Sequence, residues 1–130
     1  MSKARLIGVD LFDMVYRGHP RALSNELMVN SLATRLNFIT RLTLLKGDMR
    51  EVCDKIPDES INLFFIDGNH EYEFVKSDLQ HAWPKVKKGG VLAGHDFIHV
   101  HPGVIKAVQE WDQYPRVKIP NGSSIFYVEK

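Results

Sequence analysis

One segment limits the fold more than any other: the run at 61–66, INLFFI, which is followed at once by Asp67. A short, almost wholly apolar run of this length is typical of a buried β-strand. Because polar residues do not alternate along it, both faces of the strand are expected to be buried, as in a parallel sheet with helices on each side. The sequence therefore predicts an α/β architecture built around this strand.

Strands and helices alternate along the rest of the chain. Further strands are predicted at 5–9, 42–46 and 91–93, and helices at 21–40 and around Val52, Val75 and Val104. The Asn-Gly pair at 121–122 predicts a hairpin between 117–120 and 124–128. Right-handed crossovers then give a mostly parallel, Rossmann-like sheet with a C-terminal antiparallel hairpin. We expect one domain, residues 1–130, because no linker or repeat divides the chain.

Composition excludes several functional classes. The net charge is +1 and the basic residues are scattered, so we expect no nucleic-acid partner. No apolar run approaches the roughly 18 residues of a membrane span, and the N-terminal residues lack a signal-peptide pattern, so we expect no membrane partner and a cytoplasmic location. The single cysteine, Cys53, rules out an internal disulfide and is expected to be a small core residue.

Four predicted strands are each followed at once, or within a few residues, by an aspartate: Asp10, Asp48, Asp67 and Asp96. In open α/β sheets, ligands bind at the carboxyl ends of the strands. A single aspartate at such a position often does no more than cap the next helix. Aspartates at four strand ends favour a shared binding site instead.

The ends of two strands carry residues that suit a metal ion. Asp67, His95 and Asp96 are candidate ligands, and carboxylate with imidazole suits Mg²⁺, Mn²⁺, Fe²⁺ or Zn²⁺. An ion with open positions lowers the pKa of a bound hydroxyl and orients it. His70 is a candidate fourth ligand or general base. In the alternative, structural interpretation, His70 and His95 are simply hydrogen-bonded near helix starts.

The remaining polar residues allow fewer conclusions. An acid that ends a Rossmann strand often accepts hydrogen bonds from a ribose diol, which is a candidate role for Asp10. Asp48 is placed to accept a hydrogen bond from an adenine amino group, and both roles require a nucleoside ligand. His99 and His101 are expected to face solvent in a loop, although they are also candidates for the rim of the site.

Four segments together carry a family resemblance: IGVD at 7–10, KGD at 46–48, FIDGNHEY at 65–72 and GGVLAGHDF at 89–97. They resemble class I S-adenosylmethionine-dependent methyltransferases. The subgroup that they resemble most has a D-G-x-H-x-Y segment and a later H-D-[YF] segment, and is similar to metal-dependent O-methyltransferases. The resemblance spans nearly the whole chain and implies a Rossmann-like methyltransferase fold with S-adenosylmethionine as cofactor.

The resemblance also implies roles for individual residues. Asp10 would bind the ribose hydroxyls and Asp48 would approach the adenine, with Asp67 the third cofactor-binding candidate. Asp67, His95 and Asp96 match positions that hold a divalent ion in the metal-dependent relatives, where the last two are often both acids. His70 matches a histidine of the family whose implied role is that of a base or a metal ligand, and it is the candidate catalytic residue. The implied reaction is methyl transfer to the hydroxyl of a small-molecule acceptor.

The chain departs from the family at its start. The family has a first strand and a glycine-rich loop ahead of the segment that carries Asp10, and residues 1–9 contain neither. In the family, that strand lies between the strands that end in Asp10 and Asp67. We expect one of three outcomes: a shortened sheet, a homodimer that completes the sheet, or a longer protein that supplies the missing segment.

Two alternative functions remain open. The first is a methyltransferase-like binding module that has lost the cofactor, which the missing glycine-rich loop favours, since that loop brings backbone close to the cofactor. The second is a metal-dependent hydrolase that uses His70, His95 and Asp96. Binding of S-adenosylmethionine or S-adenosylhomocysteine would separate the methyltransferase from both alternatives.

Overall fold

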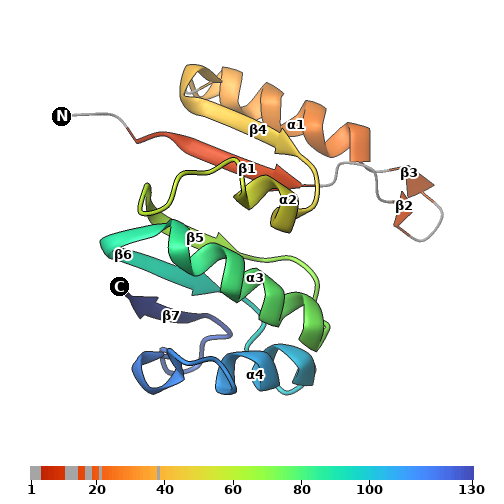
Figure 1. Cartoon of the computed structure of the whole chain (residues 1–130). Helices are drawn as coiled ribbons and strands as arrows, with labels where there is room; N and C mark the ends of the chain where they lie inside the picture. The colour runs from red at the N-terminus through yellow and green to blue at the C-terminus, as the bar shows by residue number, and fades with distance from the viewer. Residues whose placement is uncertain (1–3, 11–14, 17–18, 21, 38) are drawn as a thin grey trace. The chain divides into compact units, whose positions relative to one another are not determined.

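The computed structural model describes residues 4–10, 15–16, 19–20, 22–37 and 39–130. The chain divides into two compact units, an N-terminal unit, Met1–Val52, and a C-terminal unit, Cys53–Lys130 (Figure 1). Its described strands form separate hydrogen-bonded sheets, one with two parallel strands, one with two short antiparallel strands and one with three strands. Of the helices in the described part, none has the length and apolar character needed to cross a bilayer.

A parallel strand pair with a helical crossover makes up the described N-terminal unit. Strands β1 (Leu6–Asp10) and β4 (Leu42–Lys46) pair so that Asp10 lies opposite Lys46. The crossover contains helix α1 (Ala22–Arg35) and a 3-10 helix (Ile39–Arg41). The predicted strands at 5–9 and 42–46 are thus confirmed, and the predicted helix at 21–40 ends earlier. Helix α2 (Met49–Cys53) follows β4.

The sequence at 13–20 is polar, and its His19–Pro20 pair is typical of an irregular segment that ends in a turn. The structure instead has two short strands there, β2 (Val15–Tyr16) and β3 (His19–Pro20), which pair with each other in antiparallel fashion. Proline is tolerated in such a strand because a two-residue edge strand needs few ladder hydrogen bonds. Residues 13, 14, 17 and 18 lie outside the described residues.

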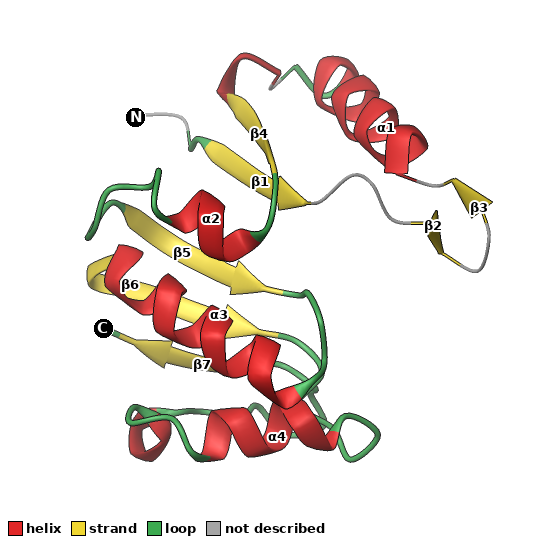
Figure 2. Ribbon diagram, turned by 45° about the vertical axis from the view of Figure 1, so that its right-hand side comes forward, coloured by secondary structure: helices red, strands yellow, loops and turns green. Residues whose placement is uncertain are grey.

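A three-stranded mixed sheet forms the base of the C-terminal unit. Strand β5 runs parallel to β6, and β7 is antiparallel to β6 (Figures 1 and 2). The elements of this unit are β5 (Ile61–Ile66), α3 (Tyr72–Lys85), β6 (Val86–Gly94), α4 (Pro102–Gln109), a 3-10 helix (Tyr114–Arg116) and β7 (Phe126–Glu129).

The strand that contains the glycine pair begins earlier than predicted. A strand was predicted at 91–93, but β6 already begins at Val86 and includes the glycine pair at 89–90, where its pairing with β5 is irregular. A Cβ on Gly90 would lie 2.9 Å from the backbone oxygens of Asn62 and Lys87, so the irregularity needs glycine there.

The predicted C-terminal hairpin is reduced to one bridge. Lys118 and Tyr127 exchange backbone hydrogen bonds of 2.8 and 2.9 Å, but residues around Lys118 form no strand of their own. The second arm pairs with β6 instead, where Tyr127 lies opposite Ala93. The fuller ladder with β6 satisfies more backbone groups than a two-stranded hairpin does.

The core of the C-terminal unit lies between one face of this sheet and the helices α3 and α4. The cluster of buried side chains comprises Val75, Leu79, Ala82, Val86, Leu92, Val104, Ala107, Val108, Phe126 and Val128. Trp83 and Trp111 pack at the margin of this cluster, edge to face, with ring centroids 5.3 Å apart and an angle of 89° between their planes. Apolar burial on this face stabilises the sheet and so fixes the positions of the strand ends that carry the candidate site residues.

The other face of β5 contradicts the prediction of burial on both faces. Phe64 and Ile66 pack against the core, whereas the alternate side chains Leu63 and Phe65 are 61% and 48% exposed. Side chains alternate between the two faces of a strand, and both helices of the C-terminal unit pack against the same face. The apolar run at 61–66 therefore forms a strand with only one face buried within this unit.

Candidate active site

Parallel pairing brings the two predicted strand-end clusters together. In β5 and β6, Ile66 lies opposite Gly94, and the amide of His95 donates a hydrogen bond of 3.1 Å to the carbonyl oxygen of Ile66. The ladder therefore continues one residue past each strand. Asp67 and the His95–Asp96 pair follow directly, so the register of the sheet places them side by side at its carboxyl edge.

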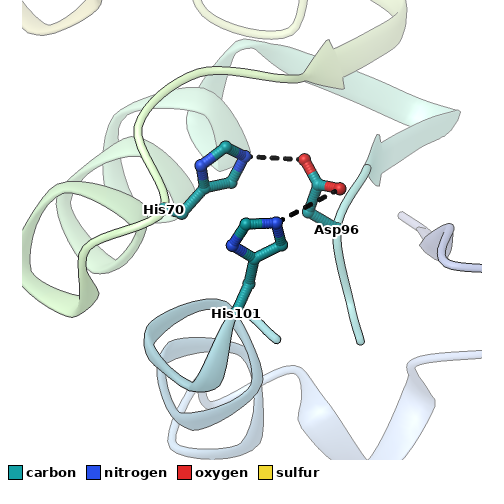
Figure 3. Close-up of side chains that lie close together, drawn as sticks. All are labelled: His70, Asp96 and His101. Carbon is teal, nitrogen blue, oxygen red and sulfur yellow. Dashed lines mark hydrogen bonds and ion pairs between the residues drawn. The ribbon is translucent and has the colours of Figure 1, made fainter. Parts of the chain in front are cut away.

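Asp96 is the centre of this site. Its Oδ2 lies 2.6 Å from Nε2 of His70, and its Oδ1 lies 2.9 Å from Nδ1 of His95 and 3.9 Å from Nε2 of His101. His70 follows β5, His95 follows β6, and His101 stands at the start of α4. One carboxylate thus gathers three imidazoles from three segments of the C-terminal unit, and Figure 3 shows two of them.

The backbone of Asp96 has an unusual conformation. Its φ of 63° is in the left-handed region, which aspartate adopts more readily than most side chains other than glycine. The turn is held by two hydrogen bonds of 2.8 Å, from the amide of Phe97 to the carbonyl of Ser124 and from the amide of Ile98 to that of Asp96. Residues in such conformations cluster at functional sites.

The pKa of Asp96 lies below its ordinary value. Burial on its own would raise this pKa, but the hydrogen bonds and charges of His70 and His95 together outweigh burial. A lowered pKa keeps the side chain ionised across the neutral range. Asp96 is therefore available at neutral pH as a hydrogen-bond acceptor or as a metal ligand.

Asp67, His95 and Asp96 offer ligand atoms that all lie within 4.8 Å of one another. Asp67 is exposed and makes no hydrogen bond or ion pair with the described residues. Nε2 of His95 lies 2.9 Å from the hydroxyl oxygen of Ser124, which orients the ring so that Nδ1 faces Asp96. A polar partner on the far nitrogen is usual for a histidine that binds a metal.

The donor set fits a divalent ion. Two carboxylates and one imidazole suit Mg²⁺, Mn²⁺ or Zn²⁺, and three protein ligands leave positions open for water or substrate. A cavity of about 10 Å³ is lined by Asp67, His70, His95 and Asp96 among others. That volume is about what one water-sized particle needs. The residues that the sequence predicted as ligands are therefore brought together, and their role as ligands stays a prediction.

The sequence favoured a solvent-facing loop position for His101, but the structure places it at the edge of the site, beside His70 and Asp96. It is half-buried, and its ring stacks on that of His70, with centroids 4.1 Å apart and an angle of 19° between the planes. The reason is the position of α4, whose first turn packs against the backbone that precedes α3. A Cβ on Gly103 would collide with the carbonyl oxygen of His70 and lie 2.8 Å from the amide nitrogen of Tyr72. His99 is exposed, as expected.

Sequence reasoning missed two further residues of this site, Ser124 and Gly103. The available signal for Gly103 was its position directly after Pro102, because proline starts helices and glycine permits close backbone approach. No local pattern distinguished Ser124 from other polar residues near the Asn-Gly pair. Its contact with His95 depends on how β7 approaches β6, which is a long-range property.

The other two candidates lie in the N-terminal unit, at the carboxyl ends of its parallel strands. The amide of Gly47 donates a hydrogen bond of 3.1 Å to the carbonyl oxygen of Asp10, which places Asp10 and Asp48 at the same edge of the β1–β4 pair. Asp10 is exposed. Its role at a ribose stays a prediction.

Asp48 has a structural role in this unit. Its Oδ1 accepts hydrogen bonds of 2.9 Å from the amide and 2.7 Å from Nε of Arg50, and its Oδ2 lies 2.5 Å from Nη2 of the same side chain. Asp48 thus caps α2 at its N-terminus and pairs with Arg50 through both oxygens. A contact between Asp48 and adenine stays a prediction, and Arg50 would have to share the carboxylate.

Comparison with known proteins identifies the family. The model of a family described as methyltransferase domain matches residues 1–97. A relative from Sinorhizobium fredii, the uncharacterized protein y4gI, is 30% identical over 78 residues, which are 60% of this chain and 9% of that protein.

Two solved structures share the fold. CalS11, a TDP-rhamnose 3′-O-methyltransferase of calicheamicin biosynthesis, is 22% identical with a TM-score of 0.65, and the match covers 96% of this chain and 58% of that one. An O-methyltransferase from Bacillus cereus in complex with SAH is 15% identical with a TM-score of 0.66, covering 97% and 63%. This chain spans less than two thirds of the length of these relatives. It belongs to the methyltransferase-domain family, and its fold is that of the class I S-adenosylmethionine-dependent methyltransferases, as the sequence motifs predicted.

Proposed function

We propose that this chain carries out, alone or within a larger protein, S-adenosylmethionine-dependent methyl transfer to the hydroxyl group of a small molecule, with a divalent ion at Asp67, His95 and Asp96. The observation that carries the proposal is the convergence of these three ligand atoms to within 4.8 Å in a chain of the methyltransferase-domain family. The ion would orient the acceptor hydroxyl and lower its pKa.

His70 is the proposed base. Its ring is partly exposed, with 44% of the side chain accessible, and Nε2 lies 2.6 Å from Oδ2 of Asp96. When Nε2 carries the ring proton, it donates a hydrogen bond to Asp96. Nδ1 then has a free lone pair, which can take the proton of the substrate hydroxyl. The lowered pKa of Asp96 keeps this partner ionised and so favours that tautomer. Asp96 thus orients His70 in the way that a carboxylate orients a catalytic histidine in other enzymes.

The chemical step is an in-line displacement. Bound S-adenosylmethionine would supply the methyl group, whose bond to the sulfonium sulfur would break, leaving the electron pair on sulfur, as the acceptor oxygen forms the new O–C bond. The acceptor's proton passes to Nδ1 of His70. Positioning carries most of the rate enhancement of such a reaction, which is why a rigid strand-end site suits it.

Binding of the methyl donor is proposed for the N-terminal unit. Asp10 ends β1, the position from which an acid accepts hydrogen bonds from a ribose diol. Asp48 follows the neighbouring strand β4, and the hydrogen bond from the amide of Gly47 to the carbonyl oxygen of Asp10 places it close to Asp10. The presence of SAH in the Bacillus cereus structure supports a donor of this chemistry for the shared fold.

Calorimetric titration of the full chain with S-adenosylhomocysteine tests the cofactor. We expect measurable binding that is lost in Asp10→Ala and kept in Glu51→Ala, the matched control. Glu51 is an exposed acid on α2 with no proposed role, so its removal changes the charge of the same unit equally. If the wild-type chain binds no ligand at millimolar concentration, the proposal is wrong for this chain, and the module without cofactor is favoured.

Manganese binding tests the ion separately. Bound Mn²⁺ loses the sharp electron-paramagnetic-resonance signal of the free ion, so a titration gives the affinity directly. We expect Asp67→Asn to weaken Mn²⁺ binding, because it removes a charged ligand, and Asp54→Asn to leave it unchanged. Asp54 is an exposed acid of the same unit outside the site. Equal Mn²⁺ affinity in Asp67→Asn and the wild type would contradict a role for Asp67 as a ligand.

A further inference from the structure

A second group of ligand atoms lies beside the first. His70, Asp96 and His101 place a ring nitrogen or carboxylate oxygen each within 4.8 Å of one another. This group shares Asp96 with the Asp67 group but has two imidazoles and one carboxylate, where the Asp67 group has two carboxylates and one imidazole. The two groups therefore differ in the kind of ion that they suit, because imidazole favours transition metals and carboxylate favours harder ions.

Nε2 of His70 and Nε2 of His101 face the same carboxylate group, that of Asp96. The two rings are stacked at 4.1 Å, and Nε2 of each ring faces the same carboxylate, at 2.6 Å for His70 and 3.9 Å for His101 (Figure 3). On a tetrahedral ion with bonds of about 2.0–2.1 Å, ligand atoms lie about 3.3 Å apart. Both distances are within about 1 Å of that value. Because a ring nitrogen binds an ion in the plane of its ring, the two rings must also rotate out of their stack to share the ion.

The backbone holds His101 at this position. His101 occupies the N-cap of α4, with φ −121° and ψ 68°, and its side chain does not cap the helix. Pro102 begins the helix, and the close contact of Gly103 with the backbone of His70 fixes the distance between the two segments. Serine, threonine, aspartate or asparagine at an N-cap stabilises a helix by about 1 kcal/mol. A histidine that forgoes this contribution and faces a carboxylate is consistent with a role other than capping.

We propose that His70, Asp96 and His101 form a second divalent-ion site, which selects Zn²⁺ and similar nitrogen-preferring ions over Mg²⁺. Three protein ligands leave a fourth position open for water, as in sites where zinc is accessible to small molecules. His70 is 44%, His101 31% and Asp96 17% accessible at the side chain, so an ion can enter from solvent.

The proposed site has a consequence for methyl transfer, which rests on the proposed function. An ion on Nε2 of His70 requires that nitrogen's lone pair, so the ring proton moves to Nδ1. Nδ1 can then no longer accept a proton from an acceptor hydroxyl. Zn²⁺ at this site would therefore inhibit the reaction, even while Mg²⁺ or Mn²⁺ supports it at the Asp67 group.

Cobalt titration of the untagged full chain tests the site without any activity measurement. Co²⁺ takes the place of Zn²⁺ and absorbs visible light with an intensity that reports its ligands, and Zn²⁺ added afterwards should displace it. We expect one tightly bound Co²⁺ per chain in the wild type, with weaker Co²⁺ binding at the Asp67 group. His101→Gln should weaken binding by more than the roughly 10–100-fold that loss of an outer-shell partner costs.

Two further variants locate the ion. His99→Gln removes an exposed histidine two residues away and should bind Co²⁺ like the wild type. Asp67→Asn should also keep Co²⁺ binding while it weakens Mn²⁺ binding, which separates this site from the proposed catalytic ion. His70→Gln provides a second ligand variant if His101→Gln does not fold, as judged by circular dichroism.

The following results would overturn the proposal: no Co²⁺ bound by the wild type, Co²⁺ affinity unchanged in both His70→Gln and His101→Gln, or Co²⁺ binding that is lost in Asp67→Asn alone. The last result would place the ion at the Asp67 group. Failure of S-adenosylhomocysteine to bind would instead contradict the methyltransferase proposal and leave the second ion site standing.

Discussion

The two units of this chain differ in how much apolar surface they bury. The C-terminal unit packs a contiguous cluster between its sheet and helices, with Leu79 and Phe126 each 1% exposed. In the described N-terminal unit, buried apolar side chains are limited to Ala33 and Val52, and α1 carries an exposed apolar face that includes Leu32. The proposed ion ligands therefore lie on a packed framework, whereas Asp10 and Asp48 lie on a strand pair with little core of its own.

The largest expected difference comes from one substitution made in both units. Leu79→Ala should destabilise the protein by about 2–5 kcal/mol, because it opens a cavity in a packed core. Leu32→Ala, at a side chain that is 50% exposed, should cost no more than about 0.5 kcal/mol. Denaturant unfolding followed by circular dichroism gives both values.

Equal destabilisation by the two leucine variants would break the comparison. It would mean that the apolar face of α1 is covered in solution, either by a second copy of the chain or by other residues of the same chain. Sedimentation velocity at two concentrations would then distinguish these occupants, since a second copy makes the effect depend on protein concentration.

A smaller effect is expected where α4 meets the segment that carries His70. Gly103→Ala adds a Cβ that collides with the carbonyl oxygen of His70, and overpacking of this kind costs about 1–3 kcal/mol. It should also separate the stacked rings of His70 and His101. Changes in the imidazole NMR signals of both residues, with that of His81 on α3 unchanged, would show the local shift. Unaltered signals would contradict the proposed role of Gly103.

A still smaller effect is expected at the start of α2. Asp48→Ala should cost about 1 kcal/mol because the amide of Arg50 loses its acceptor. Asp48→Asn should recover the capping part of this loss, since asparagine caps about as well, while solvent screens the partly exposed ion pair with Arg50. Thermal unfolding of the three proteins measures the difference. A full loss in Asp48→Asn would show that the charge, rather than the cap, is what matters.

The smallest effect at neutral pH is expected at Cys53. Burial raises the pKa of this thiol to about 11, and the nearby charge of Lys85 only partly opposes burial. The unfolded thiol ionises at about pH 8.5, so stability is unaffected below that pH and falls as pH rises toward 11. Cys53→Ala should remove this alkaline slope. Alkylation of native protein at pH 8 should be slow and should become fast in denaturant, and fast native alkylation would contradict burial.

Local sequence patterns predicted the features that depend on short-range order. The strand at 61–66 has the predicted bounds, and the site residues Asp67 and Asp96 follow strands whose register is set by apolar runs. The approach of His101 to His70 was not predictable, because it depends on the crossing of α4 and α3. The exposure of Leu63 and Phe65 was not predictable either. An apolar run shows that burial is favourable, but it does not show which helices will cover each face of the strand.

The edge-to-face tryptophan pair gives a practical means to study the two units. The chain has only two tryptophans, and Trp83 and Trp111 both belong to the C-terminal unit, with ring centroids 5.3 Å apart. Indole fluorescence therefore reports the C-terminal unit alone. A denaturation curve followed by fluorescence should coincide with the circular dichroism curve if the units melt together. If the N-terminal unit melts first, the ellipticity will fall while the emission spectrum stays unchanged.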